Sequence, residues 1–239
     1  MQIIRRVSIG LFQLATDLVS LLFPHGCCAC GVALYRGESH LCIRCISSLP
    51  YTDHHTNPDN KAAKRLWGRI PFNTAMSLLH FSKGGRVQNI IHHLKYRNNF
   101  GLGIKLGTLM AEKLQITPSL NDIDLIIPIP LHKKKEGARG YNQSQSLAEG
   151  IAAVIGVPVN NKAVIRTVAT QSQTSKNRFN RYENMKDVFR VIDAYALKNR
   201  HVLLVDDVMT TGATIESCAN ELVKSGIKKL SIVTAALAD

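Results

Sequence analysis

Aromatic residues are scarce in this sequence. Phe, Trp and Tyr make up 6% of the 239 residues, and only one of them is a tryptophan. Proteins that hold single-stranded nucleic acid by stacking use aromatic side chains for it, so the composition argues against a surface of that kind. The sequence also lacks a helix-turn-helix pattern, an internal repeat and a low-complexity segment. No part of it is therefore expected to read bases.

Acidic residues are also in short supply. Asp and Glu number 17 against 30 Lys and Arg, which gives a formal net charge of +13. This excess favours anionic partners, namely nucleic acid, a phosphorylated metabolite or both; a basic but merely solvated surface is the alternative. Hydrophobic residues make up 45%, enough for a sizeable core. The length suits one large α/β domain with a small appendage.

The N-terminal segment lacks a long uninterrupted apolar run. Gln13, Thr16 and Asp17 interrupt it and no small-residue cleavage site follows, unlike in a signal peptide. A spanning helix is disfavoured by Asp17, so we expect no membrane span and a cytoplasmic protein. The apolar residues recur at intervals of three and four, which predicts an amphipathic helix that packs on the protein or a partner, with membrane-surface contact as the weaker alternative. They are Ile4, Val7, Leu11, Leu14, Leu18 and Leu21.

Cysteines are concentrated in one short stretch. Five of the six lie between positions 27 and 45, as C27-C28-A-C30 and, eleven residues later, C42-I-R-C45. Two CxxC turns can aim four thiolates at one Zn²⁺ ion, which would be structural because four protein ligands close the site. A pair of disulfides is the alternative, which a cytoplasmic location disfavours. The predicted ligands are Cys27, Cys30, Cys42 and Cys45, with Cys28 as the spare and His25 or His40 as a substitute for one thiolate.

The rest of the chain alternates apolar strands with helices. Strands are predicted at 77–81, 124–130, 201–207 and 229–237, and helices at 87–94, 103–115, 142–155 and 212–225. This order is typical of an α/β domain with a parallel sheet covered on both faces. We therefore expect an amphipathic helix and zinc module over 1–49, a linker over 50–68 and the α/β domain over 69–239.

The segment VLLVDDVMTTGAT, residues 202–214, places two acids at the end of a buried strand. Ligands of parallel sheets bind at this end. The following loop can present several backbone N–H groups beside a helix N-terminus, which is suited to a phosphate. Gly212 allows the loop to bend, and a side chain there is expected to occupy phosphate space. Asp206 and Asp207 can accept hydrogen bonds from sugar hydroxyls, so the predicted ligand is a ribose 5-phosphate. The alternative is a capped helix without a ligand.

These residues resemble the ribose-phosphate motif of type I phosphoribosyltransferases, which bind 5-phosphoribosyl-1-pyrophosphate (PRPP) with Mg²⁺. The resemblance implies that Asp206 and Asp207, in the catalytic position, contact the ribose hydroxyls. It also implies that the loop holds the 5′-phosphate through Thr210, Thr211, Gly212, Ala213 and Thr214. LIIPIPLHKKKEGARGYNQS resembles the pyrophosphate loop, and residues 166–189 resemble the mobile loop that folds over PRPP. Lys133, Arg139 and Arg178 are the expected cationic contacts.

The order of the motifs resembles the ComF family from about residue 14 to the end. The motifs are an apolar helix, CxxC…CxxC, LKYR, PIPL…ARGYNQS, TxxQSQ…R…N and LLVDDVMTTGAT. The resemblance implies an accessory protein of DNA uptake that works with a helicase on incoming single-stranded DNA, which we expect to bind weakly and electrostatically. One departure is that some relatives carry a further cysteine pair, so a double zinc ribbon is not expected. An active phosphoribosyltransferase and a PRPP-sensing regulator are the alternatives.

Overall fold

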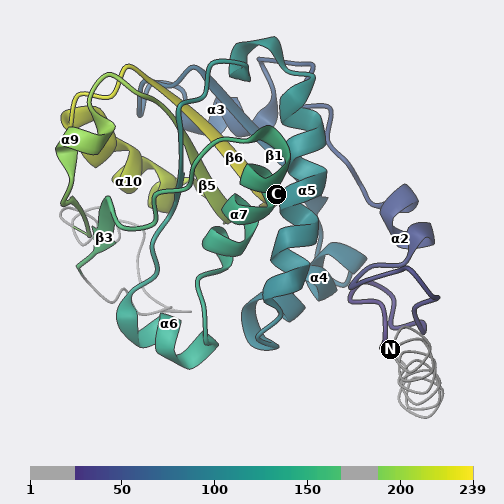
Figure 1. Ribbon diagram of the computed structural model, residues 1–239. Helices are drawn as coiled ribbons and strands as arrows, with labels where there is room; N and C mark the ends of the chain where they lie inside the picture. The colour runs from purple at the N-terminus through teal and green to yellow at the C-terminus, as the bar shows by residue number, and fades with distance from the viewer. Residues whose placement is uncertain (1–24, 168–187, 239) are drawn as a thin grey trace, which may run out of the picture. The chain divides into compact units, whose positions relative to one another are not determined.

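The computed structural model describes residues 25–167 and 188–238, which Figure 1 shows in colour. The chain divides into two compact units, Met1–Ser48 and Leu49–Asp239, and each is described by itself below. The predicted N-terminal amphipathic helix lies outside the described residues, as does Arg178.

The first unit is built from tight turns and short bridges. Gly26 bridges Ala33, Ser39 bridges Leu41, and helix α2 (Ile43–Ser48) follows. Gly31 has a φ of +77° and donates its N–H to the Cys27 carbonyl at 2.8 Å. This is the left-handed conformation that glycine adopts most easily, and it closes the first CxxC turn.

The second unit is organised around a four-stranded parallel sheet. The strands are β1 (Thr74–Phe81), β6 (Lys229–Ala238), β5 (His201–Met209) and β2 (Leu125–Pro128), which lie side by side in that order. Nearly every residue of β6 and the first half of β5 is buried, as expected of strands covered on both faces. The predicted parallel α/β architecture is confirmed.

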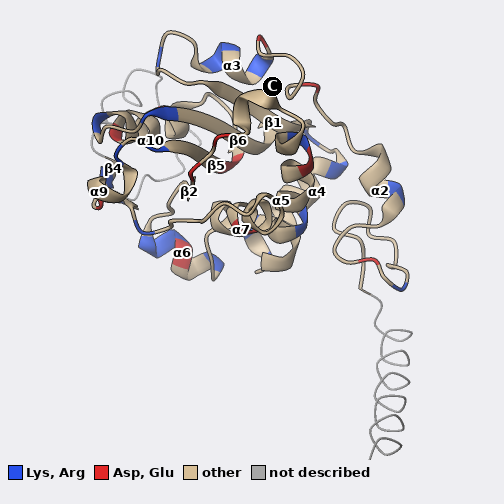
Figure 2. Ribbon diagram, turned by 45° about the horizontal axis from the view of Figure 1, so that its top comes forward, with Lys and Arg blue, Asp and Glu red and all other residues tan. Residues whose placement is uncertain are grey.

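Helices cover both faces of this sheet. In Figure 2, α3 (Lys61–Leu66) and α10 (Ala213–Lys224) lie above the sheet, and α4 (Arg86–Tyr96), α5 (Phe100–Gln115) and α7 (Gln143–Ile155) lie below it. Glycines let α5 and α7 approach closely. A Cβ atom at Gly107 would lie 2.2 Å from the Leu147 carbonyl oxygen, and one at Gly150 would lie 2.3 Å from that of Ile104.

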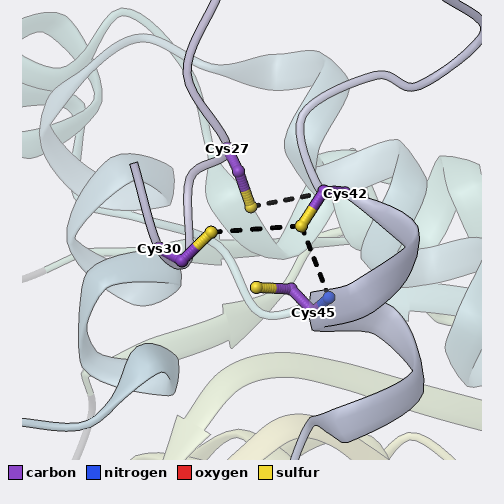
Figure 3. Close-up of side chains that lie close together, drawn as sticks. All are labelled: Cys27, Cys30, Cys42 and Cys45. Atoms are coloured by element: carbon purple, nitrogen blue, oxygen red, sulfur yellow. Dashed lines mark hydrogen bonds between the residues drawn. The ribbon is translucent and has the colours of Figure 1, made fainter. Parts of the chain in front are cut away.

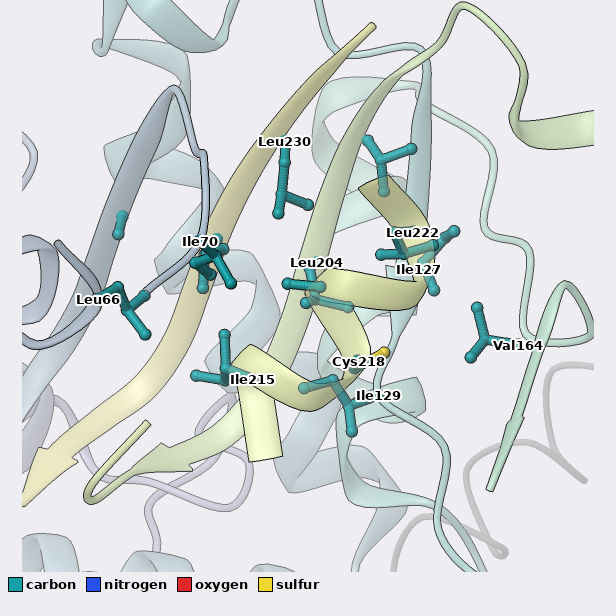
Figure 4. Packing of buried hydrophobic residues seen from close by; sticks show 14 of the residues in the cluster. Leu66, Ile70, Ile127, Ile129, Val164, Leu204, Ile215, Cys218, Leu222 and Leu230 are labelled. Atoms are coloured by element: carbon teal, nitrogen blue, oxygen red, sulfur yellow. The ribbon is translucent and has the colours of Figure 1, made fainter. Parts of the chain in front are cut away.

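The core above the sheet joins α3 and α10 to the strands (Figure 4). Ile215, Cys218 and Leu222 of α10 are at most 1% exposed and pack in one cluster with Leu204 of β5. Leu66 of α3 belongs to the same cluster. The lone Cys218 is thus a core residue, as its helical pattern predicts.

Several short elements were not predicted. They are α2, α3, 3₁₀ helix η1 (Pro118–Leu120), α6 (Lys133–Arg139), β3 (Val164–Arg166), β4 (Phe189–Val191) and α9 (Ala194–Leu197). β3 and β4 pair antiparallel at the two ends of the segment that resembles a mobile loop. Residues 168–187 of that segment lie outside the part of the chain that the structure describes.

Residues 50–68, for which the sequence suggested a linker, are an ordered part of the second unit. Thr52 donates its N–H to the Leu78 carbonyl and His80 to that of Pro50, both at 2.9 Å, so this segment lines the edge of β1. Asn60 caps α3 through its side chain and also donates to the Ala75 carbonyl at 2.9 Å. Because Leu66 is fully buried, this segment contributes to the core and does not simply connect two domains.

Candidate ligand and metal sites

Four cysteines of the first unit converge on one point (Figure 3). The Sγ atoms of Cys27, Cys30, Cys42 and Cys45 all lie within 4.8 Å of one another. They are the four predicted ligands, brought together by the turn at Gly31 and by α2. The group does not include Cys28, His25 or His40, and all six cysteines are free of disulfides.

Backbone N–H groups point at these sulfurs. Cys42 donates its N–H to Cys27 Sγ and Cys45 donates to Cys42 Sγ, both at 3.4 Å. Burial raises the pKa of the Cys27 thiol, but hydrogen bonds led by that from Cys42 outweigh this and lower the pKa to about 7. Hydrogen bonds of this kind favour the thiolate, which is the form that binds metal.

The spacing of the sulfurs fits a tetrahedral ion. Zn–S bonds of about 2.3 Å place two sulfurs of a tetrahedron about 3.8 Å apart. Cys30 Sγ and Cys42 Sγ are 3.9 Å apart. The four cysteines are therefore positioned to bind a metal ion without a large rearrangement.

The acid pair lies near the carboxyl end of β5. Asp206 Oδ1 accepts a hydrogen bond from Ser144 Oγ at 3.0 Å and from the Asp207 N–H at 2.9 Å. Asp207 Oδ2 lies 3.0 Å from Lys95 Nζ. Helices α7 and α4 thus each supply one polar partner to the pair. Both acids are half-buried within the strand.

The environment of Asp206 disfavours its negative charge. Burial, followed by the neighbouring Asp207 carboxylate, raises the pKa of Asp206 to about 7, although the Asp207 N–H, the Ser144 hydroxyl and Lys95 oppose the shift. Two adjacent carboxylates in a partly dry site cannot ionise independently. A cation or several hydroxyl donors at this position would relieve the repulsion, so the pair is suited to a ligand that brings either.

The predicted loop leads directly from β5 into α10. Gly212 precedes the helix with a φ of +78°, and Ala213 N lies 3.5 Å from Thr211 Oγ1. The first N–H groups of an α-helix have no partner within the helix, and here they follow the acid pair by a few residues. Loop and helix N-terminus form an arrangement that can accept an anion.

The structure gives a reason for glycine at 212 that the sequence did not suggest. A Cβ atom there would lie 2.9 Å from Leu66 Cδ2 and 3.3 Å from Arg69 Nη1. A side chain at 212 would therefore displace the side chains of Leu66 and Arg69. The positive φ supplies a second reason for glycine.

A cavity of about 390 Å³ opens beside the acid pair. The loop contributes Thr210 and Thr214, and Ser144 comes from α7. Three cations line the same space: Lys95 from α4, Arg139 from α6 and Arg166 from β3. Gln143 and an apolar wall complete the lining, and the residues of that wall are Phe81, Ile91, Ile129, Leu131, Val208 and Ala238. The cavity therefore joins acids, hydroxyls and cations in one place.

The cations are close enough to influence one another. Burial lowers the pKa of Lys135, and the nearby charges of Arg166, Arg139 and Lys95 lower it further. Arg139 donates to Gln143 Oε1 at 2.6 Å, which fixes its position beside the cavity. Figure 2 shows the concentration of lysine and arginine on α6. Such a cluster favours a ligand with several negative charges.

The predicted contacts are only partly assembled. Arg139 and the loop threonines Thr210 and Thr214 line the cavity, whereas Lys133 is exposed at the start of α6 and is not part of the lining. Sequence reasoning missed Lys95, Ser144 and Arg166 as site residues. Lys95 stands in the LKYR motif and Ser144 in the GYNQS motif, so both motifs carried a signal.

Comparison with known proteins gives homologues over most of the chain. Competence protein F of Haemophilus influenzae is 26% identical over 221 residues, covering 88% of this chain and 96% of that protein. DNA utilization protein YhgH of Escherichia coli K12 is 27% identical, covering 86% and 87%. Competence protein ComFC of Bacillus subtilis is 30% identical over 43% of this chain and 39% of that protein. The predicted resemblance to the ComF family is confirmed. No family model matches the chain.

Among solved structures, the glutamine PRPP amidotransferase of B. subtilis, in complex with ADP and GMP, aligns with 60% of this chain and 30% of that one. The sequence identity is 16% and the TM-score is 0.42. In the two described stretches of the chain, no helix has the length and apolar character needed to cross a membrane.

Proposed function

We propose that this chain is a ComF-type accessory protein of DNA uptake whose second unit binds PRPP with Mg²⁺ in the cavity beside β5. The observation that carries the proposal is the acid pair Asp206–Asp207, followed by the 210–214 loop and faced by three cations across one cavity. Each part suits one portion of the ligand.

The acids and the loop match the ribose 5-phosphate end of PRPP. Asp206 and Asp207 accept hydrogen bonds from the ribose 2′ and 3′ hydroxyls, in place of part of their present partners. The amides and hydroxyls of Thr210, Thr211, Gly212, Ala213 and Thr214 receive the 5′-phosphate beside the N-terminus of α10.

The cations match the pyrophosphate end. Three cations line the cavity: Lys95, Arg139 and Arg166. Their charges contribute to the lowered pKa of Lys135. Lys133 and Arg178 remain proposed contacts that come from α6 and from the segment 168–187. Mg²⁺ enters with PRPP and neutralises part of its charge, and the carboxylates of the acid pair are oxygen ligands of the type that this ion prefers.

The proposed cellular role draws on the names of the relatives, which refer to competence and DNA utilization. The partners are single-stranded DNA, held weakly through the net charge of +13, and the competence helicase with other DNA-processing proteins. DNA binding is expected to weaken steeply with salt, since phosphate contacts release counterions. The cysteine group binds structural Zn²⁺, and the protein works in the cytoplasm.

An active phosphoribosyltransferase of nucleotide metabolism is the second candidate. The observation that favours it is the apolar wall of the same cavity, formed in part by Phe81, Ile91 and Ala238. A flat acceptor base could lie against this wall, next to the acid pair. Release of pyrophosphate from PRPP in the presence of one of a panel of bases would favour the enzyme, and binding without turnover would favour the accessory role.

The decisive test is calorimetry with PRPP and Mg²⁺ on the wild type, Asp206→Asn and Asp207→Asn. Hydrogen bonds to charged groups are worth about 1.5–3 kcal/mol, so each substitution should weaken binding roughly ten- to a hundredfold. Asp59→Asn, a change at an exposed aspartate of the second unit, serves as the control and should bind like the wild type. Wild-type affinity in both Asn variants of the pair would remove the support for a ribose ligand.

A further inference from the structure

We propose that Arg65 and Arg69 are positioning residues that orient the phosphate loop, residues 210–212, from the side opposite the ligand. The inference rests on the proposed function, because it assigns these arginines to the loop that receives the 5′-phosphate. Both belong to the segment at and just after α3, which no sequence motif connects with the ligand.

The two guanidinium groups bind consecutive carbonyl groups of the loop. Arg65 Nη1 donates to the Thr210 carbonyl oxygen at 2.5 Å and lies 3.5 Å from that of Met209. Arg69 Nη1 donates to the Thr211 carbonyl oxygen at 2.6 Å and to the Arg65 carbonyl oxygen at 2.8 Å. The same arginine therefore ties the loop to α3.

Fixing a carbonyl also fixes the next amide. In a trans peptide the C=O and N–H groups point in opposite directions, and the chain contains no cis peptide bond among its described residues. The N–H groups of Thr211 and Gly212 thus point away from Arg65 and Arg69. Thr210 and Thr214 line the cavity, whereas Leu66 and Arg69 lie where a side chain at Gly212 would project. The arginines hold the back of the loop while its front faces the ligand.

The arginines are themselves held in place. Arg69 Nε donates to Glu216 Oε2 at 3.0 Å, and its Nη2 contacts the same oxygen. Glu216 belongs to the first turn of α10, so this helix fixes the guanidinium group of Arg69. Between the two arginines in the sequence, Leu66 is fully buried in the core. A binding loop supported by residues that are locked in this way needs less reorganisation when its ligand arrives.

An ordinary surface ion pair would not have this geometry. Arg69 and Glu216 are 29% and 15% exposed, and an ion pair alone would need no loop carbonyl as acceptor. Here two arginines, one turn of chain apart, bind two neighbouring carbonyls of the loop that precedes α10. The arrangement therefore points to control of the amide directions rather than to surface charge.

The test compares ribose 5-phosphate with inorganic pyrophosphate, each titrated separately by calorimetry into the full chain. Arg65→Gln and Arg69→Gln should each raise the Kd for ribose 5-phosphate by roughly tenfold, because loop amides lose their orientation. The Kd for pyrophosphate, which occupies the other end of the site, should stay within about twofold of the wild type. Arg65→Lys, which keeps a charge and a donor, should recover part of the loss.

Lys64→Gln is the matched control, since it removes one exposed positive charge from the same helix. It should change both affinities by less than about twofold. An equal loss for both ligands in Arg65→Gln, or no loss for ribose 5-phosphate, would overturn the inference. A wild type that binds neither ligand would instead overturn the proposed function.

Glu216→Gln separates positioning from charge and decides the matter if an arginine variant does not fold. It frees Arg69 from its anchor and makes the protein more positive by one charge. Positioning predicts that ribose 5-phosphate binds more weakly, by about threefold or more. A purely electrostatic role predicts equal or tighter binding of the anion, and that result would contradict the proposal.

Discussion

The ammonium group of Lys95 lies 3.0 Å from Oδ2 of Asp207, and the two side chains are only 23% and 14% exposed. A helix that follows β1 thereby reaches the acid pair near the end of β5, two strands away in the sheet. The cation lowers the cost of placing two carboxylates side by side, and it also faces the cavity in which we place an anionic ligand.

Replacement of Lys95 by glutamine should weaken the binding of pyrophosphate by roughly tenfold. The change removes a cation from the cavity and leaves Asp207 without its partner, so both effects make the site less attractive to an anion. Calorimetry with pyrophosphate measures the effect. Lys83→Gln, at an exposed position in the turn before α4, is the control and should match the wild type. Equal affinities in the two variants would show that Lys95 does not face the ligand.

Replacement of Gly212 by alanine should lower both the stability and the affinity for ribose 5-phosphate. A residue with a side chain pays about 1–2 kcal/mol in the left-handed conformation, and its Cβ would also lie 2.9 Å from Leu66 Cδ2. Gly226→Ala is a matched control, because its φ is +82° and nothing lies within 4 Å of the added Cβ. Denaturant unfolding of both variants isolates the contact with Leu66.

In the Gly226 variant the backbone strain acts alone, so its loss of stability should be smaller and its ligand affinity unchanged. A Gly212 variant that is no less stable than the Gly226 variant would mean that α3 yields to the side chain. Unchanged affinity for ribose 5-phosphate would mean that the loop tolerates the shift.

The long strands and helices of the second unit could be predicted from the sequence because their signals are local. The run VLLV of β5 is apolar without interruption, and LSIVTAAL of β6 is interrupted only by Ser231 and Thr234, as expected of strands buried on both faces. Because the acid pair directly follows VLLV, one part of the site could be predicted to lie at the carboxyl end of this strand. Helix α3 was missed because six residues in a polar segment show too little periodicity to reveal a buried face.

The remaining parts of the site depend on contacts between distant segments. Arg65 and Arg69 reach Thr210 and Thr211 only because α3 and α10 pack in one core. Arg166 comes from a three-residue strand, β3, and nothing in its own surroundings in the sequence singles it out from the other cations nearby. Such residues are selected by the fold, and a pattern along the chain does not show them.

The stability contributed by Asp206 should depend on pH. Its pKa is raised to about 7 in the folded protein, against about 3.9 in an unfolded chain. Between these values the folded state binds the proton and the unfolded state does not, so the free energy of unfolding falls as the pH rises. Asp206→Asn removes this dependence. Relative to the wild type, the variant should therefore gain stability from pH 5 to pH 8, as measured by denaturant unfolding.

Asp59→Asn changes an exposed carboxylate and should keep a constant difference from the wild type over the same range. A constant difference for Asp206→Asn as well would contradict the raised pKa of Asp206.

Removal of metal should unfold the first unit. Its buried hydrophobic residues, among those that the structure describes, are three cysteines of the group, Cys27, Cys42 and Cys45, together with Cys28, Ala29 and Leu41. So small a core cannot offset the conformational entropy of its turns, whereas zinc binding in small modules is worth about 10–16 kcal/mol.

Elemental analysis should find about one zinc per chain, and Cys45→Ser should lose the metal and become sensitive to proteolysis within residues 25–48. Cys28→Ser, buried but outside the group, should retain both metal and protease resistance. Purified protein without zinc, or equal zinc loss in the two variants, would show that the four sulfurs do not form the metal site.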